Sequence, residues 1–199
     1  MSVTVINYDR DVTRWEPNAR GRLEQAAMKL YVERGFEQTT VADIAKQAGL
    51  SERTFFRHFA DKREVLFWGS GALQELLVSS IASAPAEVSP IEAIAGALET
   101  AGALLQERRD GALLRQSVIA ANAELQEREL IKLASLASAL ADALRQRGVR
   151  DPAASLCSET GIVVFKVAFG RWISETNPQS FPYLIRELFD ELKGVAAGD

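Results

Sequence analysis

Residues 39–59, TTVADIAKQAGLSERTFFRHF, decide how the first part of the chain folds. The stretch predicts two short helices joined by a tight turn. The apolar residues of the first helix recur at i, i+3, i+4 and i+7 and form one stripe: Val41, Ile44, Ala45 and Ala48. Thr39 or Thr40 can cap this helix, and Gly49 ends it, because glycine readily adopts the left-handed conformation found at helix C-termini.

The second helix of the stretch starts after Ser51, which can act as its N-cap. Phe55 and Phe59 are four residues apart and can hold the helix on the core. The remaining side chains, Glu52, Arg53, Phe56 and Arg57, then form an outward face. A helix, a glycine-containing turn and a second helix are the elements of a helix-turn-helix, whose second helix reads base edges in the DNA major groove.

The segment 41–66, VADIAKQAGLSERTFFRHFADKREVL, is similar to the DNA-binding signature of the TetR family of bacterial transcriptional regulators. The resemblance covers roughly residues 19–66. Its elements are the TT before the motif, IA in the first motif helix, GLS at the turn, TFF in the second helix, and HF followed by a lysine three residues later. The resemblance implies a repressor that binds a near-palindromic double-stranded DNA operator as a homodimer.

Roles in DNA binding are predicted for individual residues. Thr40, at a helix N-terminus, suits a phosphate oxygen. Arg53 pairs with guanine and Glu52 accepts from cytosine, while Thr54 meets a thymine methyl group or a phosphate. Arg57 adds local positive charge. The alternative is that Thr40 and Ser51 only cap helices and that the charged residues are a solvated face.

The resemblance adds three further residues to the predicted DNA interface. Phe56 stands where many family members have tyrosine, so the hydroxyl that would bond a phosphate is missing and an apolar face remains. His58 and Lys62 match family positions that touch the DNA backbone. The alternative for Phe56 is a place in the core beside Phe55.

Composition limits the classes of function. The 199 residues are 47% hydrophobic and 25% charged, as in an ordinary globular protein. With one cysteine, Cys157, and one histidine, His58, we expect no disulfide framework, no metal site and no cofactor. A serine or cysteine nucleophile activated by histidine would need a histidine outside the motif, so we expect no enzyme. No signal peptide or membrane span is evident, which predicts a cytoplasmic protein.

The net charge of −4 does not by itself favour nucleic acid. Residues 1–65 contain 11 Lys or Arg and 10 Asp or Glu, a balance of +1, which leaves −5 for the remainder. DNA binding must therefore rely on locally placed cations.

The whole chain is predicted to be all-α, with about nine helices in two domains. Residues 1–17 are expected to be a flexible arm whose arginines reach DNA or, alternatively, a solvated tail. A three-helix DNA-binding domain follows at 18–65, with its motif at 40–59. Residues 66–199 are expected to form a helical ligand-binding and dimerisation domain, entered through a long helix from about 61 to 83 that opens with a capping box at Asp61 and Glu64.

Two helices near the C-terminus predict a homodimer. The segment from about 152 to 175 is apolar almost all round, and the segment from about 179 to 196 is amphipathic, so both need partners. The resemblance implies that these helices pair into a four-helix bundle. The predicted interface residues are Val163, Val167, Phe181, Leu184, Ile185, Leu188 and Leu192.

The resemblance also implies a small apolar effector bound among the middle helices, which shifts the linking helix and releases DNA. The body is similar to repressors of the mycofactocin-associated kind, which implies acyl-thioester-like ligands. The predicted pocket residues are Trp68, Leu104, Gln116, Ile119, Asn122, Phe165, Lys166, Phe169 and Trp172. Two alternatives stay open: the aromatic residues are plain core, or the protein is a helical dimer that binds a protein or a lipid-like partner and keeps a degenerate motif.

Overall fold

The computed structural model describes residues 18–174, 176 and 179–198, so the predicted N-terminal arm lies outside the described residues. The described part is all-helical and contains no strand. The helices are α1 (Ala19–Arg34), α2 (Val41–Gln47), α3 (Glu52–His58), α4 (Glu64–Phe67), α5 (Ser70–Ser83), α6 (Pro90–Gln106), α7 (Arg109–Ala120), α8 (Ala123–Gln146), α9 (Ala153–Ser174) and α10 (Phe181–Ala197).

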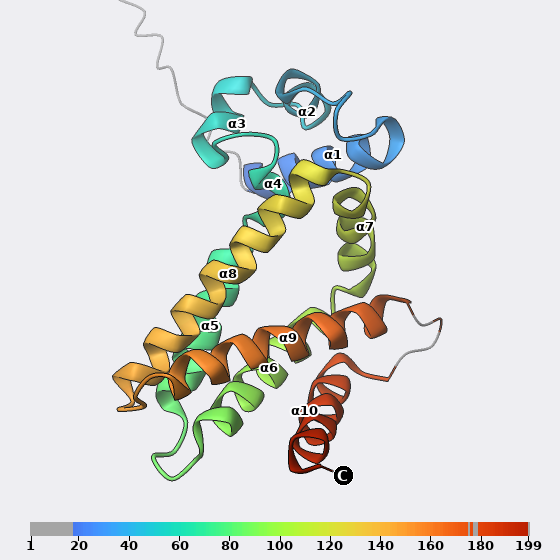
Figure 1. Cartoon of the computed structure of the whole chain (residues 1–199). Helices are drawn as coiled ribbons and strands as arrows, with labels where there is room; N and C mark the ends of the chain where they lie inside the picture. Colours follow the sequence, from blue (N-terminus) through green and yellow to red (C-terminus); the bar gives the residue numbers. More distant parts are fainter. Residues whose placement is uncertain (1–17, 175, 177–178, 199) are drawn as a thin grey trace, which may run out of the picture.

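Helices α1 to α3 form a small unit at one end of the molecule (Figure 1), which we call the reader. Thr40 and Asp43 form a capping box at the start of α2, and the Ser51 hydroxyl accepts from the Thr54 amide at the start of α3. Between these helices Gly49 has φ +66°, the left-handed conformation that the sequence predicted. Arg22 of α1 donates to the carbonyl of Ala48 at 2.5 Å, so α1 closes the C-terminal end of α2.

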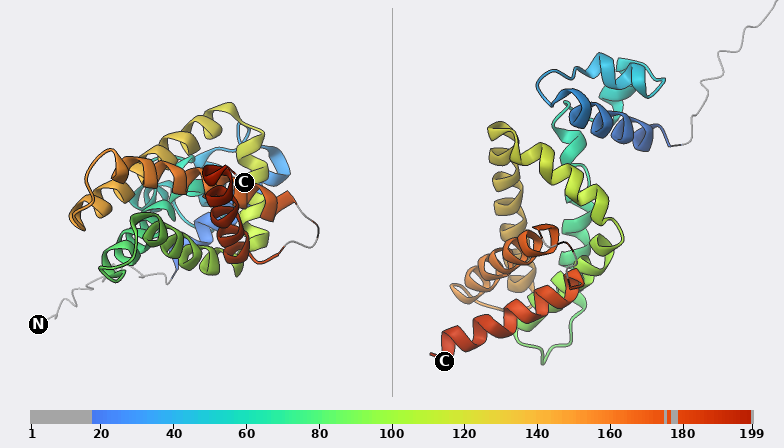
Figure 2. Two further views of the ribbon diagram at one scale, coloured as in Figure 1. Left: turned by 60° about the horizontal axis from the view of Figure 1, so that its bottom comes forward. Right: turned by 90° about the vertical axis from the view of Figure 1, so that its right-hand side faces the viewer.

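The other helices form a body below the reader. Helices α5 and α8 pack side by side, α6 packs on α5, α9 and α10, and α7 rises from α6 to the reader (Figures 1 and 2). Figure 2 shows α10 at the end of the body that lies farthest from the reader. The helix-turn-helix and the last helix therefore occupy opposite ends of the chain's fold.

Two hydrophobic cores hold this arrangement together. The body core joins residues of α5, α6, α8, α9 and α10. The reader core is built around Leu23, Ile44 and Phe55, and it also includes Val118 and Ile119 from the end of α7. The reader is thus packed on the α7–α8 corner as well as joined to the body by chain connectivity.

The long helix predicted from about 61 to 83 is the element for which the prediction and the structure differ most. The chain from Glu64 to Ser83 is divided into α4 and α5 at Trp68 and Gly69, where α4 ends. Asp61 does accept from the Glu64 amide, as a cap would, but the Glu64 side chain pairs with α8 instead of returning to the cap.

Two stretches, 64–83 and 153–174, are long and apolar enough to cross a membrane by length and composition alone. In the structure both belong to packed helices of the body, which pair with α6, α8 and α10. Their hydropathy is the pattern expected of helices that contribute side chains to a core.

We predict that Gly49→Ala lowers the free energy of unfolding by about 1–2 kcal/mol, the cost of a left-handed conformation for a residue with a Cβ atom. The added Cβ would also lie 2.9 Å from an Arg22 guanidinium nitrogen. Urea denaturation followed by circular dichroism measures the change.

The matched control is Gly71→Ala, at an exposed site in α5 with open space around the new Cβ. It should leave stability unchanged or raise it by up to about 1 kcal/mol. An equal loss of stability in both variants would contradict the role given to Gly49.

Candidate nucleic-acid interface

The face of α3 that points away from the reader core carries four of the predicted DNA-binding side chains. Phe55 is fully buried and fixes the rotation of the helix, with its ring 5.4 Å from that of Phe59. Glu52, Arg53, Phe56 and Arg57 are exposed as a consequence. Phe56 is 55% exposed and contacts the edge of Phe55, so it is not part of the core. Its assignment to the DNA interface stays a prediction.

The two predicted threonines use their hydroxyls within the motif. Thr40 Oγ1 accepts from the Asp43 amide at 3.1 Å and donates to the Asp43 carboxylate at 2.6 Å. Thr54 Oγ1 lies 3.0 Å from the Ser51 hydroxyl. Both hydroxyls are therefore held in place at helix N-termini. Their contacts with phosphate or thymine stay predictions.

Lys62 requires a correction. Its ammonium group donates to the carbonyl oxygens of Phe36, Glu37 and Thr39 at 2.8, 3.3 and 3.0 Å, and it lies 4.3 Å from the centroid of the Phe36 ring. An ammonium has three donors, and all three are used. Lys62 thus holds the α1–α2 loop and does not present a free charge to the DNA backbone. The three carbonyls are close only in the folded chain, so sequence spacing alone did not reveal them.

His58 also differs from its predicted role. Its Nε2 is buried and has no hydrogen-bond partner in the described part of the chain. Burial lowers the pKa of the imidazole, and Arg57 and Arg20 lower it further. The ring is therefore neutral at pH 7, and its Nε2 is not on the surface of α3 that carries Arg53. A contact between Nε2 and the DNA backbone is not possible in this arrangement.

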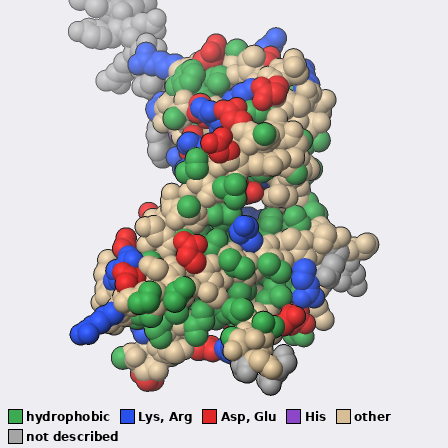
Figure 3. All heavy atoms as spheres, viewed as in Figure 1, with side chains coloured by type: hydrophobic (Ala, Val, Ile, Leu, Met, Phe, Trp, Pro, Cys, Tyr) green, Lys and Arg blue, Asp and Glu red, His purple; other side chains and the backbone are tan. Residues whose placement is uncertain are grey.

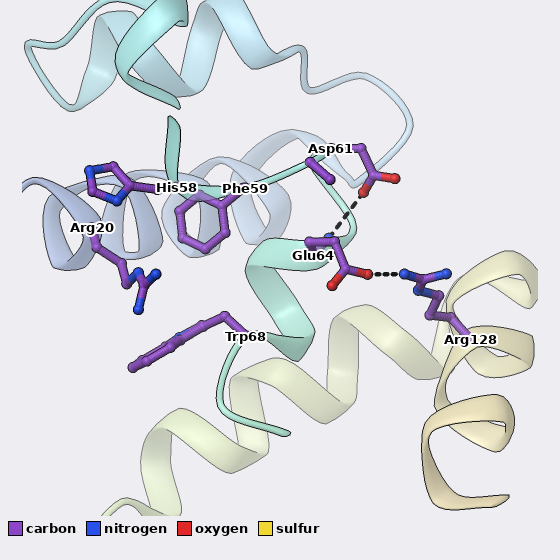
Figure 4. Close-up of a pocket in the computed structure, with 8 residues that line it drawn as sticks. Arg20, His58, Phe59, Asp61, Glu64, Trp68 and Arg128 are labelled. Atoms are coloured by element: carbon purple, nitrogen blue, oxygen red, sulfur yellow. Dashed lines mark hydrogen bonds and ion pairs between the residues drawn. The ribbon is translucent and has the colours of Figure 1, made fainter. Parts of the chain in front are cut away.

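His58 instead lines a pocket of about 380 Å³ between the reader and α8 (Figure 4). Figure 4 shows α3 on one side of this pocket and α7 and α8 on the other. The lining residues are Arg20, His58, Phe59, Ala60, Asp61, Glu64, Trp68 and Arg128. Sequence reasoning had not grouped these residues, because they come from three separate segments.

Helix α4 is tied to the body by charged side chains of α7 and α8. Glu64 accepts from Arg128 and lies 3.6 Å from the Lys132 ammonium, both on α8. Arg115 of α7 donates to the Leu66 carbonyl at 2.8 Å. These contacts connect the orientation of the reader to the positions of α7 and α8.

The predicted effector residues do not meet in one place. Trp68 and Leu104 are exposed, Gln116 and Asn122 are half-buried, and Asn122 donates to the Val118 carbonyl at 2.8 Å. Ile119 is fully buried in the reader core. A side chain with no accessible surface touches no space large enough for water, so Ile119 is not a pocket wall in this arrangement.

The remaining predicted effector residues lie on α9. Phe165 and Phe169 are half-buried, and Lys166 points to solvent. Trp172 is fully buried and stacks on Phe181 at 4.8 Å, which places it in the core and corrects its assignment to a pocket wall. The plain-core alternative for the aromatic residues therefore holds for Trp172.

The predicted dimer interface divides into two groups. Val163, Val167 and Leu192 are exposed and Leu188 is half-buried, so these side chains are available to a partner. Phe181, Leu184 and Ile185 are fully buried in the chain's own core and are corrected as interface residues. These residues recur at helical spacing because they pack on α6 and α9. The same spacing would be seen if they packed on a partner, so the sequence could not distinguish the two. Figure 3 shows hydrophobic side chains gathered on the face of the body that α9 crosses.

Comparison with known proteins agrees with this geometry. Residues 24–67 match the sequence model of the family described as "Bacterial regulatory proteins, tetR family". The transcriptional regulator TcmR of Streptomyces glaucescens is 38% identical over 94 residues, 47% of this chain and 40% of TcmR. The matches to the curated relatives thus span less than half of each relative's length.

Solved structures are similar over most of the chain. FadR of Thermus thermophilus, a TetR-family repressor solved with lauroyl-CoA, has a TM-score of 0.56 and 24% identity, over 87% of this chain and 92% of its own. FadR of Bacillus subtilis, solved with stearoyl-CoA, has a TM-score of 0.62 and 20% identity, over 86% and 96%. At these identities the likeness shows the shared fold.

We predict that Lys62→Met and Arg57→Ala differ in their effect on the salt dependence of DNA binding. A cation that neutralises a phosphate contributes close to one unit to the slope of log K against log salt. Arg57→Ala should reduce this slope by about 1, whereas Lys62→Met should leave it unchanged. The salt dependence of DNA binding, measured by fluorescence anisotropy, separates the two.

Lys62→Met should instead lower the free energy of unfolding by roughly 1.5–3 kcal/mol, the range for hydrogen bonds from a charged group. Urea denaturation of the same variant tests this. A reduced salt slope together with unchanged stability would contradict the structural role of Lys62.

Proposed function

Because the chain belongs to the TetR family of bacterial transcriptional regulators, we propose that it is a repressor that binds a near-palindromic operator as a homodimer and is released by a small apolar effector. The observation that carries the proposal is the exposed face of α3, with Glu52 and Arg53 in its first turn and Phe55 buried behind them. The family is one of regulators, so we assign no catalytic role.

DNA binding is proposed to take place with α3 in the major groove. Arg53 and Glu52 are the base readers, since arginine binds guanine through two hydrogen bonds and glutamate accepts from cytosine. Thr40, Thr54, Phe56 and Arg57 contact phosphates or thymine methyl groups around them. The Arg53 side chain is exposed and has no ion-pair partner in the described part of the chain, so no ion pair has to break when it binds DNA.

A homodimer is proposed to form through α9 and the end of α10. The exposed apolar residues of α9 recur along one face, and α10 adds two more: Leu156, Val163, Val167, Leu192 and Val195. One copy presents a single short recognition helix, whereas a two-fold dimer reads two half-sites about one DNA turn, roughly 34 Å, apart.

The effector is proposed to act through α7 and α8, because these helices hold α4 through Arg115, Arg128 and Lys132. A ligand releases DNA only if it binds the off-DNA arrangement more tightly, and couplings of about 1–3 kcal/mol are typical. Among the structural neighbours, two FadR proteins were solved with acyl-CoA esters. Acyl-CoA esters are therefore reasonable first compounds to test for release of DNA.

Arg53→Ala should weaken binding to the operator by about 1–3 kcal/mol per half-site and broaden the sequence preference at the base it reads. Arg150→Ala is the matched control, an exposed arginine in the α8–α9 connection. Fluorescence anisotropy with operator variants measures both. Equal affinities for wild type and Arg53→Ala would refute the assigned role and favour the alternative of a degenerate motif in a protein-binding or lipid-binding dimer.

The double variant Val163→Glu/Val167→Glu should raise the dimer dissociation constant at least about tenfold, or 1.4 kcal/mol, because it places like charges in a desolvated interface. Val32→Glu introduces the same change at a valine of α1 that is similarly exposed. Sedimentation velocity at micromolar concentration compares the three proteins. A wild-type monomer would contradict the proposed dimer.

A further inference from the structure

The pocket shown in Figure 4 lies where the reader meets the body, apart from the exposed face of α3 and from the α9 face proposed for dimerisation. Its walls come from α1, from the segment that connects α3 to α5, and from α8. A volume of about 380 Å³ falls within the range of small-molecule sites, which run from roughly 300 to 1,000 Å³. The pocket is therefore large enough for a compact organic molecule.

The acidic residues of the pocket are already neutralised. Asp61 accepts from the Arg63 guanidinium at 3.0 and 2.7 Å. Glu64 accepts from Arg128 and lies 3.6 Å from the Lys132 ammonium. Neither carboxylate needs a further cation, so the pocket offers little to a positively charged ligand.

Arg20, in contrast, has no carboxylate within ion-pair distance in the described part of the chain. Its side chain is exposed, and its guanidinium lies 5.2 Å from the centroid of the Trp68 ring. The acid nearest in sequence on the same helix is Glu24. Burial raises the pKa of Glu24 to about 7, although the charges of Arg20 and Arg108 act to lower it. Arg20 therefore feels the charge of Glu24 but forms no ion pair with it.

Two aromatic side chains of the pocket lie near Arg20. His58 lines the pocket, but its Nε2 has no accessible surface and is not available to a ligand. Trp68 is 42% exposed, which is a large accessible surface for an indole. Figure 4 shows the Arg20 guanidinium between the His58 ring and Trp68, so a cation and an apolar ring lie on one side of the pocket.

We propose that this pocket binds a small organic anion, a carboxylate or a phosphate monoester. The charged oxygen atoms meet the guanidinium of Arg20, and the apolar part lies against Trp68. A guanidinium is the side chain best suited to both anions, because its fork of donors matches their oxygen geometry. Of the residues predicted to bind the effector, only Trp68 lines this pocket, and the wall of reader and body residues places the ligand at the junction between the two.

Isothermal titration calorimetry of the full chain tests the proposal, with phenyl phosphate and benzoate as probes and benzyl alcohol as the uncharged probe. We expect saturable binding of both anions and at least tenfold weaker binding of the alcohol. Arg20→Gln should lower the affinity for both anions at least tenfold. Lys29→Gln, which removes an exposed cation from the same helix, should leave these affinities unchanged. Circular dichroism confirms that each variant is folded.

A second variant tests the place of the apolar group. Wild type should prefer phenyl phosphate to inorganic phosphate at least fivefold, and Trp68→Leu should remove most of that preference. The absence of saturable anion binding, or equal losses in Arg20→Gln and Lys29→Gln, would overturn the proposal. The proposal would also be overturned if Arg20→Gln weakened the binding of DNA but not the binding of the small anions, since Arg20 would then bind a phosphate of the DNA backbone. No DNA is present in the calorimetry, so its result is independent of the proposed repressor function.

Discussion

The burial of Phe55 is the constraint on which the reader depends. The ring is fully enclosed by the reader core, beside Phe59 and Ile44. A helix that commits this side chain to the core has no freedom to rotate, so its first turn must present Glu52 and Arg53 to solvent. The left-handed turn at Gly49 and the cap at Ser51 then set the direction from which α3 starts. Packing of one aromatic ring thus fixes which side chains of α3 are exposed to solvent.

The same reader core reaches beyond the reader. Val118 and Ile119 at the end of α7 and Leu125 at the start of α8 are part of it. Charged contacts at α4, from Arg115 and Arg128, run along the same boundary. The body and the reader are therefore connected both by a shared hydrophobic core and by hydrogen bonds. The pocket at Arg20 and Trp68 opens on this boundary.

The helix-turn-helix could be predicted from the sequence because its signals are local. Threonine and serine caps, a glycine at a helix end and apolar spacing within seven residues all act between near neighbours, and the structure has each of them. Long-range contacts were not predictable in this way. The three carbonyls that bind Lys62 and the burial of the His58 Nε2 depend on segments brought together by folding. Family resemblance suggested roles for both residues that this chain's geometry does not support.

The body shows a second limit of sequence patterns. Periodicity in α10 identified apolar residues correctly, but it did not say whether Phe181 and Leu184 face the chain's own core or a partner; both are in the core. On α9, Val163 was assigned to the dimer interface and Trp172 to the effector pocket; Val163 is exposed, whereas Trp172 is enclosed in the core. The pocket at the reader junction was missed because its lining combines charged residues from α1, α4 and α8, none of which forms a motif.

We propose that the exposed face of α3 reads a DNA sequence. Fluorescence anisotropy of the wild-type protein against tiled fragments from around its own gene, at two salt concentrations and with excess non-specific competitor, tests this role. We expect tight binding to one near-palindromic fragment, weakened by salt but retained over competitor. Uniform weak binding to all fragments would show that α3 does not read a sequence.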